Sequence, residues 1–264
     1  MAKAKWIAFP HPSKAFEYRG EALRKAWEKL HRGDREPFPK DPKAQEAWRL
    51  FHQGEFEDAV AKGLAAGGAG ITAANKAEAI YANGVETRDA ARVAHFEAVM
   101  KRAEAQARAE PKCANAHYLY AYAAGRYSQR ISVVKALAEG YGGRIRRALE
   151  AALALDAKHA DAHTAMGMFH AEILDKVGAL VGGMTYGAKR DSGEDHLRKA
   201  MKLNPDSPIA CVEAANGLAM LHGRKLLEEA QALHSRAAAM KPRDAMEWID
   251  VEAAKAKARQ PLLR

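Results

Sequence analysis

The sequence predicts an all-α protein made of a series of paired helices. Almost no stretch alternates Val, Ile and Thr as a strand does, whereas alanine-rich segments with the spacing of an amphipathic helix occur along the whole chain. Several of these segments end in a similar closing sequence, which occurs as Glu110-Pro111, Leu203-Asn204-Pro205 and Met240-Lys241-Pro242, and without proline as Leu155-Asp156-Ala157. This recurrence indicates repeated helical units, and such arrays bind other molecules far more often than they catalyse.

The composition is consistent with this fold class. Apolar residues make up 48% of the 264 residues but aromatic residues only 7%, and alanine supplies much of the apolar total. Alanine is the best helix former, and its small side chain lets helices pack closely. A chain of this length can bury a substantial core, either as one extended domain or as two small ones.

The first 42 residues predict a basic helix followed by a linker. Apolar residues lie near one stripe of a helix from Ser13 to Leu30, and the hydroxyl of Ser13 is a plausible N-cap. Residues 31–42 hold three prolines, which are typical of a linker. We therefore predict an N-terminal helix and linker over 1–42, a helical repeat domain over 43–258 and a tail over 259–264.

Helix pairs are expected from residue 43 onward. The expected pairs are Lys43–Gln53 with Phe56–Ala66, Thr72–Asn83 with Thr87–Ala109, Ala114–Gln129 with Arg144–Leu155, Ala160–Leu174 with Lys189–Leu203, and Pro208–Leu221 with Arg224–Met240. Glycines at position 54 and over 67–70 hinge or break the chain between helices. A last helix, about Arg243–Lys257, is highly charged, as expected for a polar end that stops further copies from stacking.

These pairs resemble tetratricopeptide repeats, which carry a Gly or Ala where the first helix meets its partner, small residues in the second helix and a closing proline. The first unit has Ala47, Leu50, Gly54, Phe56 and Ala59 at matching spacings, and Gly167 occupies the close-contact place of a later unit. Ala152, Ala200 and Ala237 lie where a small side chain lets two helices approach within about 8–10 Å. The resemblance implies a tetratricopeptide-like α-solenoid of about five helix pairs, with a leading helix and a charged C-terminal helix.

Two units are longer than the usual repeat because they carry insertions at Ile131–Gly143 and Asp175–Ala188. Long connections joined to this repeat pattern look like the regulator of microtubule dynamics family and the helical T component of TRAP-type transporters. The first resemblance implies a non-enzymatic α-solenoid, which associates with microtubules in eukaryotic members. The second implies a helical body with a cavity or pore for an apolar ligand. Because those components are lipoproteins and this chain shows no lipobox cysteine, their location is not carried over.

The formal net charge of +9 has two interpretations. One is a basic patch for nucleic acid, acidic lipid or an acidic protein. The one we favour is a set of solvated helix faces with mixed charge, because acidic residues dilute the basic ones and no aromatic stacking set lies beside them. Nucleic acid is therefore not an expected partner.

The N-terminal residues and the hydropathy predict a cytoplasmic protein without a transmembrane segment, and the cysteines say little about the compartment. Cys113 and Cys211 are interpreted as small core residues, since two thiols do not make a disulfide framework. The N-terminal residues lack the sustained apolar stretch of a secretory signal. The longest uncharged apolar run, Val177 to Ala188, is far shorter than the roughly 20 residues that span a bilayer.

Signals for chemistry are weak, and we expect no catalytic site, cofactor or metal. His159, His163 and His170 could share one helical stripe, as metal ligands do, but the repeat alignment places His163 and His170 against neighbouring helices, so we interpret the histidines as core or half-buried. The glycine-rich segment 63–72 lacks the lysine and preceding strand of a phosphate loop, and a plain turn is favoured. No Ser-His-Asp or Cys-His set falls together in the sequence.

The inner face of the array is the predicted binding site. Counting from the closing sequences identifies the positions of three successive first helices that are expected to face a concave groove. They are Asn115, Tyr118, Tyr122 and Arg126, then Asp161, Thr164, Met168 and Glu172, then Ile209, Val212, Asn216 and Met220. Tyrosine offers contact area with a hydrogen-bonding tip and methionine adapts to irregular partners, which suits a peptide or an amphiphile. The alternative, that these residues pack on the inserted loops or on the terminal helix, stays open.

We therefore predict a non-catalytic scaffold whose concave groove binds a protein or peptide partner. The alternative is a binding protein for a small hydrophobic ligand, held between the groove and the insertion at 175–188. In that case the cavity would be lined or gated by Val177, Leu180, Val181, Met184 and Tyr186. The other interpretation of the insertion is a short helix and turn that fills a gap in the stack.

Overall fold

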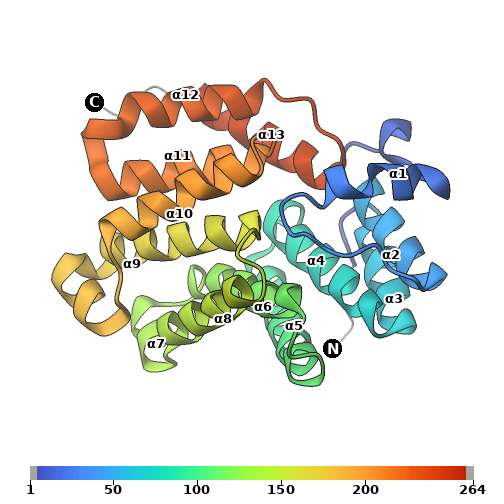
Figure 1. Ribbon diagram of the computed structural model, residues 1–264, viewed down its shortest axis with the longest axis horizontal. Helices are drawn as coiled ribbons and strands as arrows, with labels where there is room; N and C mark the ends of the chain where they lie inside the picture. The colour runs from blue at the N-terminus through green and yellow to red at the C-terminus, as the bar shows by residue number, and fades with distance from the viewer. Residues whose placement is uncertain (1–4, 260–264) are drawn as a thin grey trace. The chain divides into compact units, whose positions relative to one another are not determined.

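The computed structural model describes residues 5–259, which form helices joined by turns and contain no strand (Figure 1). The all-α prediction is confirmed. The helices are η1 (Lys14–Phe16), α1 (Glu21–Leu30), α2 (Pro42–Gln53), α3 (Phe56–Ala66), α4 (Ala69–Gly84), α5 (Asp89–Ala109), α6 (Ala114–Ser128), α7 (Val133–Ala138), α8 (Tyr141–Leu155), α9 (Ala160–Tyr186), α10 (Arg190–Leu203), α11 (Pro208–His222), η2 (Gly223–Leu226), α12 (Leu227–Ala238) and α13 (Ala245–Ala258).

The chain divides into two compact units. Among the described residues, the first unit holds 5–31, 36–141 and 244–246, and the second holds 32–35, 142–243 and 247–259. This division differs from the boundaries expected at residues 42 and 258, which stay a prediction.

In the first unit, α2 and α3 form the expected first helix pair. Asp41 caps α2 by accepting a hydrogen bond from a first-turn N–H, and Pro42 opens the helix at a position where a missing N–H costs nothing. Gly54 ends α2 with φ 93°, in the left-handed region that favours glycine. The rings of Phe51 and Phe56, 6.0 Å apart, then pack across the turn. The predicted hinge at Gly54 is confirmed.

The glycine-rich segment after α3 is a turn between helices, as favoured from the sequence. The chain reverses through Gly67–Gly68, both with positive φ. A Cβ on Gly63 would clash with the carbonyl oxygen of Gly70, so α3 and α4 approach more closely there than any larger residue permits. Helix α4 then packs against α3, α5 and α6 within the first unit.

The predicted leading helix is interrupted. Ser13 caps only a short 3₁₀ turn, η1, by accepting a hydrogen bond from a backbone N–H within it. Gly20, with φ 55°, separates η1 from α1. The prediction of one continuous helix from Ser13 to Leu30 is therefore wrong, because the chain uses the freedom of Gly20 to leave helical geometry. The apolar stripe does exist, and Leu23 and Trp27 are buried.

In the second unit, α9, α10 and α11 lie side by side around three glycines (Figure 1). A Cβ on Gly167 of α9 would lie 2.6 Å from Cγ of Leu197 on α10, and a Cβ on Gly217 of α11 would lie 2.6 Å from Cδ1 of the same leucine. A Cβ on Gly193 of α10 would lie 3.0 Å from Cβ of His170 on α9. These contacts confirm the close-contact role expected for Gly167, and they show that α10 runs antiparallel to α9.

Both predicted insertions are largely helical. The first contains α7 and the start of α8. Through the second, α9 continues to Tyr186 with a bend at Gly178, whose φ of 78° and ψ of 166° are not helical. A Cβ on Gly182 would lie 3.1 Å from Ile173, so the part of α9 beyond the bend lies against the part before it. The first insertion is therefore a separate short helix followed by the start of α8, and the second is an extension of α9.

Two further expectations concern the cysteines and the membrane. Cys211 is buried in a core cluster with Leu197, Leu218 and Leu221, as a small core residue should be, and Cys113 is half-buried. Across residues 5–259, no helix combines the length and the apolar character that crossing a membrane requires.

Candidate functional site

The groove positions predicted on α6, in the first unit, are partly buried. Asn115 donates a hydrogen bond from Nδ2 to Oε2 of buried Glu36 over 2.6 Å, and Tyr118 is buried as well. The expectation that these two positions are open is wrong, and at Asn115 the cause is the contact with Glu36. Tyr122 and Arg126, further along the helix, are half-buried, with the guanidinium 5.4 Å from the ring centroid.

The positions predicted on α9 and α11, in the second unit, divide in the same way. Met168 and Val212 belong to the hydrophobic core cluster, so the expectation that they face a groove is wrong. Thr164 is also buried, and its hydroxyl donates to the carbonyl oxygen of Ala160. For Met168 the cause is the close packing of α9 on α11, since a Cβ on Gly217 of α11 would lie 3.1 Å from its Sδ. Asp161, Glu172, Ile209 and Asn216 are half-buried, and Met220 is 43% exposed.

The apolar side chains of the second insertion do not line a cavity. Leu180 and Met184 are 76% and 82% exposed, and Val181 is exposed too. Their exposure corrects the expectation of a cavity wall at these positions, whereas the interpretation as a short helix and turn that fills a gap stays a prediction. Tyr186 is half-buried, and its carbonyl oxygen accepts a hydrogen bond from Arg146 over 2.8 Å.

The first unit holds a buried network of two imidazoles and one carboxylate that the sequence did not indicate. Nδ1 of His52 lies 2.7 Å from Oδ2 of Asp244, and Nε2 of His52 lies 3.2 Å from Nε2 of His31. All three residues are at most 3% exposed, and both imidazoles contact the indoles of Trp27 and Trp48. This arrangement lies within the core, where it joins the residue before α13 to α2.

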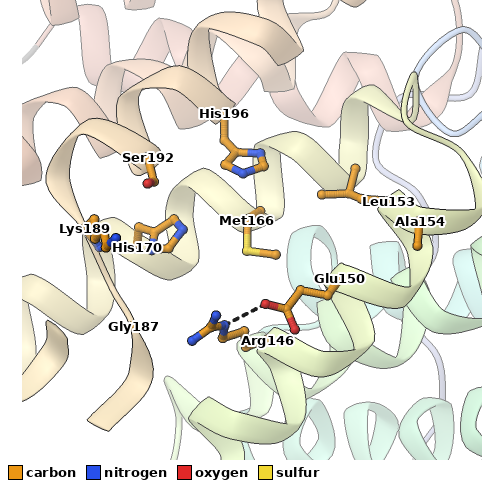
Figure 2. A pocket seen from close by; sticks show the side chains of 10 residues that line it. All are labelled: Arg146, Glu150, Leu153, Ala154, Met166, His170, Gly187, Lys189, Ser192 and His196. Atoms are coloured by element: carbon orange, nitrogen blue, oxygen red, sulfur yellow. Dashed lines mark hydrogen bonds and ion pairs between the residues drawn. The ribbon is translucent and has the colours of Figure 1, made fainter. Parts of the chain in front are cut away.

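The second unit contains a pocket of about 580 Å³ between α8, α9 and α10, shown in Figure 2. It is lined by Arg146, Glu150, Leu153, Ala154, Met166, His170, Gly187, Lys189, Ser192 and His196. Pockets of roughly 300–1,000 Å³ hold small organic molecules in many proteins. We refer to it below as the histidine pocket.

Hydrogen bonds determine which nitrogen of His196 carries the proton. Nε2 of His163 lies 3.1 Å from the carbonyl oxygen of Ala157, and because a carbonyl only accepts, His163 carries its proton on Nε2. Its Nδ1 is then an acceptor, and it lies 2.7 Å from Nδ1 of His196, which must donate. In neutral His196 the remaining nitrogen, Nε2, therefore holds a lone pair, and no described residue donates to it.

The opposite tautomer holds for His170. The backbone N–H of Lys189 donates to Nδ1 of His170 over 3.3 Å, so neutral His170 carries its proton on Nε2. The pocket thus contains one imidazole that can donate and one that can accept.

Burial keeps these imidazoles uncharged near neutral pH. Burial lowers the pKa of His196 to about 4, and the nearby His163, His170 and Lys199 add to the effect. Burial is also the main cause of the lowered pKa values of His163 and His170.

The charges in the histidine pocket are unevenly paired. Nε of Arg146 donates to Oε1 of Glu150 over 2.8 Å, so these two charges compensate each other. Lys189 forms no ion pair with any described residue, and the hydroxyl of Ser192 has no hydrogen-bond partner among them. The pocket therefore has one uncompensated positive charge.

The structure gives no support to the metal hypothesis for the three histidines. His159 caps α9 by accepting a hydrogen bond at Nδ1 from the N–H of Ala162, while His163 pairs with His196. Within residues 5–259, no three His, Cys, Asp or Glu side chains are placed to hold a metal ion. Sequence reasoning missed His196 altogether. The signal available in the sequence was that both helices of the predicted pair Ala160–Leu174 and Lys189–Leu203 carry histidines.

The comparisons with known proteins identify the fold. A solved structure of a thermophilic TPR protein from Thermus thermophilus superposes on this chain with a TM-score of 0.57 at 16% sequence identity. The match covers 81% of this chain and 99% of that protein. No family model matches the sequence, and no curated protein matches it. The helical repeat fold of the tetratricopeptide type, expected from the sequence, is therefore confirmed.

Proposed function

We propose that this protein is a non-catalytic scaffold that binds an extended segment of a protein partner along exposed faces of its first helices. Folds of the tetratricopeptide type commonly mediate binding between proteins. The observation that carries the proposal is the side chain of Asn216 on α11, which is half-buried and has no hydrogen-bond partner among the described residues.

The surroundings of Asn216 suit a peptide. A Cβ on Gly217 would lie 3.1 Å from Sδ of Met168, so α9 and α11 are in contact at this level. One turn further along α9 lies Glu172, and one turn further along α11 lies Met220. A side-chain amide offers both a donor and an acceptor, which match the two polar groups of a peptide unit. The exposed methionine beside it can adapt to different side chains.

A second surface of the same kind lies on α6 in the first unit. Tyr122 and Arg126 are half-buried there and contribute an aromatic ring and a positive charge. Both residue types are enriched where proteins bind one another.

The two family resemblances stated from the sequence favour different kinds of partner. Similarity to the regulator of microtubule dynamics family favours a protein partner, and similarity to the T component of TRAP-type transporters favours a small apolar ligand. The exposure of Leu180 and Met184 leaves the second without the apolar cavity wall expected from these side chains, so we favour the protein partner. A location in the cytoplasm stays a prediction.

The proposal is tested by selecting peptides from a displayed random library on the immobilised full chain. Affinities of the selected peptides are then measured for the wild type, Asn216→Ala, Met220→Ala and Lys202→Ala. Lys202 is an exposed residue of α10 and serves as the matched control. We expect roughly fivefold or larger losses for the first two variants and none for the control. Failure to select any peptide, or equal binding by Asn216→Ala, would contradict the proposal.

A further inference from the structure

We propose that the histidine pocket binds a small monocarboxylic acid that carries a hydroxyl or N–H group and a short apolar chain. This binding site is separate from the helix faces considered above. Its residues come from three helices and the connection between α9 and α10.

The pocket has a polar end and an apolar end. In Figure 2, Lys189, His170 and Ser192 lie toward one side, and Leu153 and Ala154 lie toward the other, with the thioether of Met166 between them. A ligand that fills the pocket must therefore be polar at one end and apolar at the other. Two hydrocarbon side chains and a thioether make room for a short alkyl chain.

The polar end suits a carboxylate. It offers the ammonium group of Lys189, the Nε2–H of His170 and the hydroxyl of Ser192, and none of these three groups has a partner among the described residues. A carboxylate is acceptor-only and can accept from several donors at once. Hydrogen bonds to an ionised group are roughly twice as strong as those between neutral groups.

The number of charges favours a single negative charge on the ligand. Arg146 is paired with Glu150, so that only Lys189 is uncompensated, and both imidazoles are neutral near pH 7. A monocarboxylate would neutralise that charge. A dianion such as a phosphate monoester carries one negative charge more than Lys189 compensates.

His196 adds a requirement for a donor on the ligand. Its Nδ1–H is used by His163, and the lone pair of its Nε2 is left for the pocket. A hydroxyl or N–H group on the ligand would donate to that lone pair, whereas a purely aliphatic acid offers it no donor.

The framework of the pocket is held independently of any ligand. Arg146 donates to the carbonyl oxygen of Tyr186, and the N–H groups of Gly187 and Ala188 donate to carbonyls of α9. Gly193 brings α10 close to His170. A pocket with walls held in this way binds without a large ordering cost.

Isothermal titration calorimetry on the full chain tests the proposal with four probes of equal chain length. They are 3-hydroxyoctanoate, octanoate, octanol and octyl phosphate. We expect 3-hydroxyoctanoate to bind most tightly, octanoate several-fold more weakly because it lacks the donor, and octanol and octyl phosphate at least tenfold more weakly. Equal binding of octanol and 3-hydroxyoctanoate, or no binding of either acid, would overturn the proposal.

Variants separate the histidine pocket from a nonspecific apolar surface. Lys189→Ala, at an exposed position, should weaken the binding of 3-hydroxyoctanoate by about tenfold or more, and Ser192→Ala should weaken it by a smaller factor. Lys202→Ala should leave the affinity unchanged. His196→Ala should reduce binding of 3-hydroxyoctanoate to the level of octanoate. Unchanged binding by Lys189→Ala overturns the proposal, even if His196→Ala fails to fold. Asn216→Ala should not change the affinity for these acids. This result would distinguish the histidine pocket from the peptide surface.

Discussion

Nδ1 of His163 and Nδ1 of His196 lie 2.7 Å apart, although 33 residues separate them in the chain. The two rings lie on neighbouring antiparallel helices, and the carbonyl of Ala157 sets the direction of the hydrogen bond between them. Their positions determine the chemistry of the histidine pocket and the response of the protein to pH.

Stability should fall as the pH is lowered from about 6.5 toward 4. The pKa of His196 is about 4 in the folded chain and near its ordinary value of 6.5 in the unfolded chain. Between these values the unfolded state binds more protons, so the free energy of unfolding rises with pH. The lowered pKa values of His163 and His170 act in the same direction.

Urea unfolding of the wild type and His196→Gln from pH 7 to pH 4.5 measures this effect. The variant should lose part of the pH dependence, because one of the titrating groups is gone. An identical slope in both proteins would show that His196 titrates normally in the folded state.

Gly167→Ala should destabilise the protein by about 2 kcal/mol. The added Cβ would lie 2.6 Å from Cγ of Leu197 and 3.0 Å from the carbonyl oxygen of Gly193, so the two helices must move apart. Gly125→Ala is the matched control, because a Cβ on this glycine of α6 meets nothing within 4 Å. That variant should be about 0.5–1 kcal/mol more stable than the wild type. Urea unfolding measures both, and a stabilised Gly167→Ala would contradict the packing.

Asp244→Ala should destabilise the first unit by about 1–3 kcal/mol, because it leaves the buried Nδ1 of His52 without its partner. Asp244→Asn keeps an oxygen that can accept a hydrogen bond and should cost less. Chemical denaturation of the two variants tests the order. The prediction fails if the alanine variant is as stable as the wild type.

Leu180→Ser and Met184→Ser should each change stability by less than about 0.5 kcal/mol. Both side chains are largely exposed, so their replacement removes little buried apolar area. Thermal unfolding is a sufficient measurement here. A loss of several degrees would instead indicate that these side chains are covered in the folded protein, as the cavity-wall interpretation requires.

The sequence predicted the helices well where glycine, proline and closing sequences mark their ends. Helix α3 has the expected bounds, and the turn at Gly54 has the left-handed conformation expected of a hinge. The prediction failed at Ser13 to Leu30, where an amphipathic stripe continues across a break at Gly20. Periodicity reports which residues share a face, but it does not report whether the backbone between them is continuous.

The binding residues were less predictable. Repeat spacing placed Met168 and Val212 on the first helices, as the structure has them, but both belong to the core because α9 and α11 pack at their level. The same spacing did not predict the histidine pocket, whose residues come from three helices. No local pattern in the sequence indicated His196, because its partner, His163, lies on the preceding helix of the array.

The sequence by itself determined the helical class, the bounds of many of the helices and the place of Gly167 between neighbouring helices, because these depend on local periodicity and on side-chain size along the chain. Only the tertiary structure decided which helix faces stay exposed and which side chains meet in the histidine pocket. Those properties depend on contacts between residues far apart in the sequence, and the period of a single helix carries no information about them.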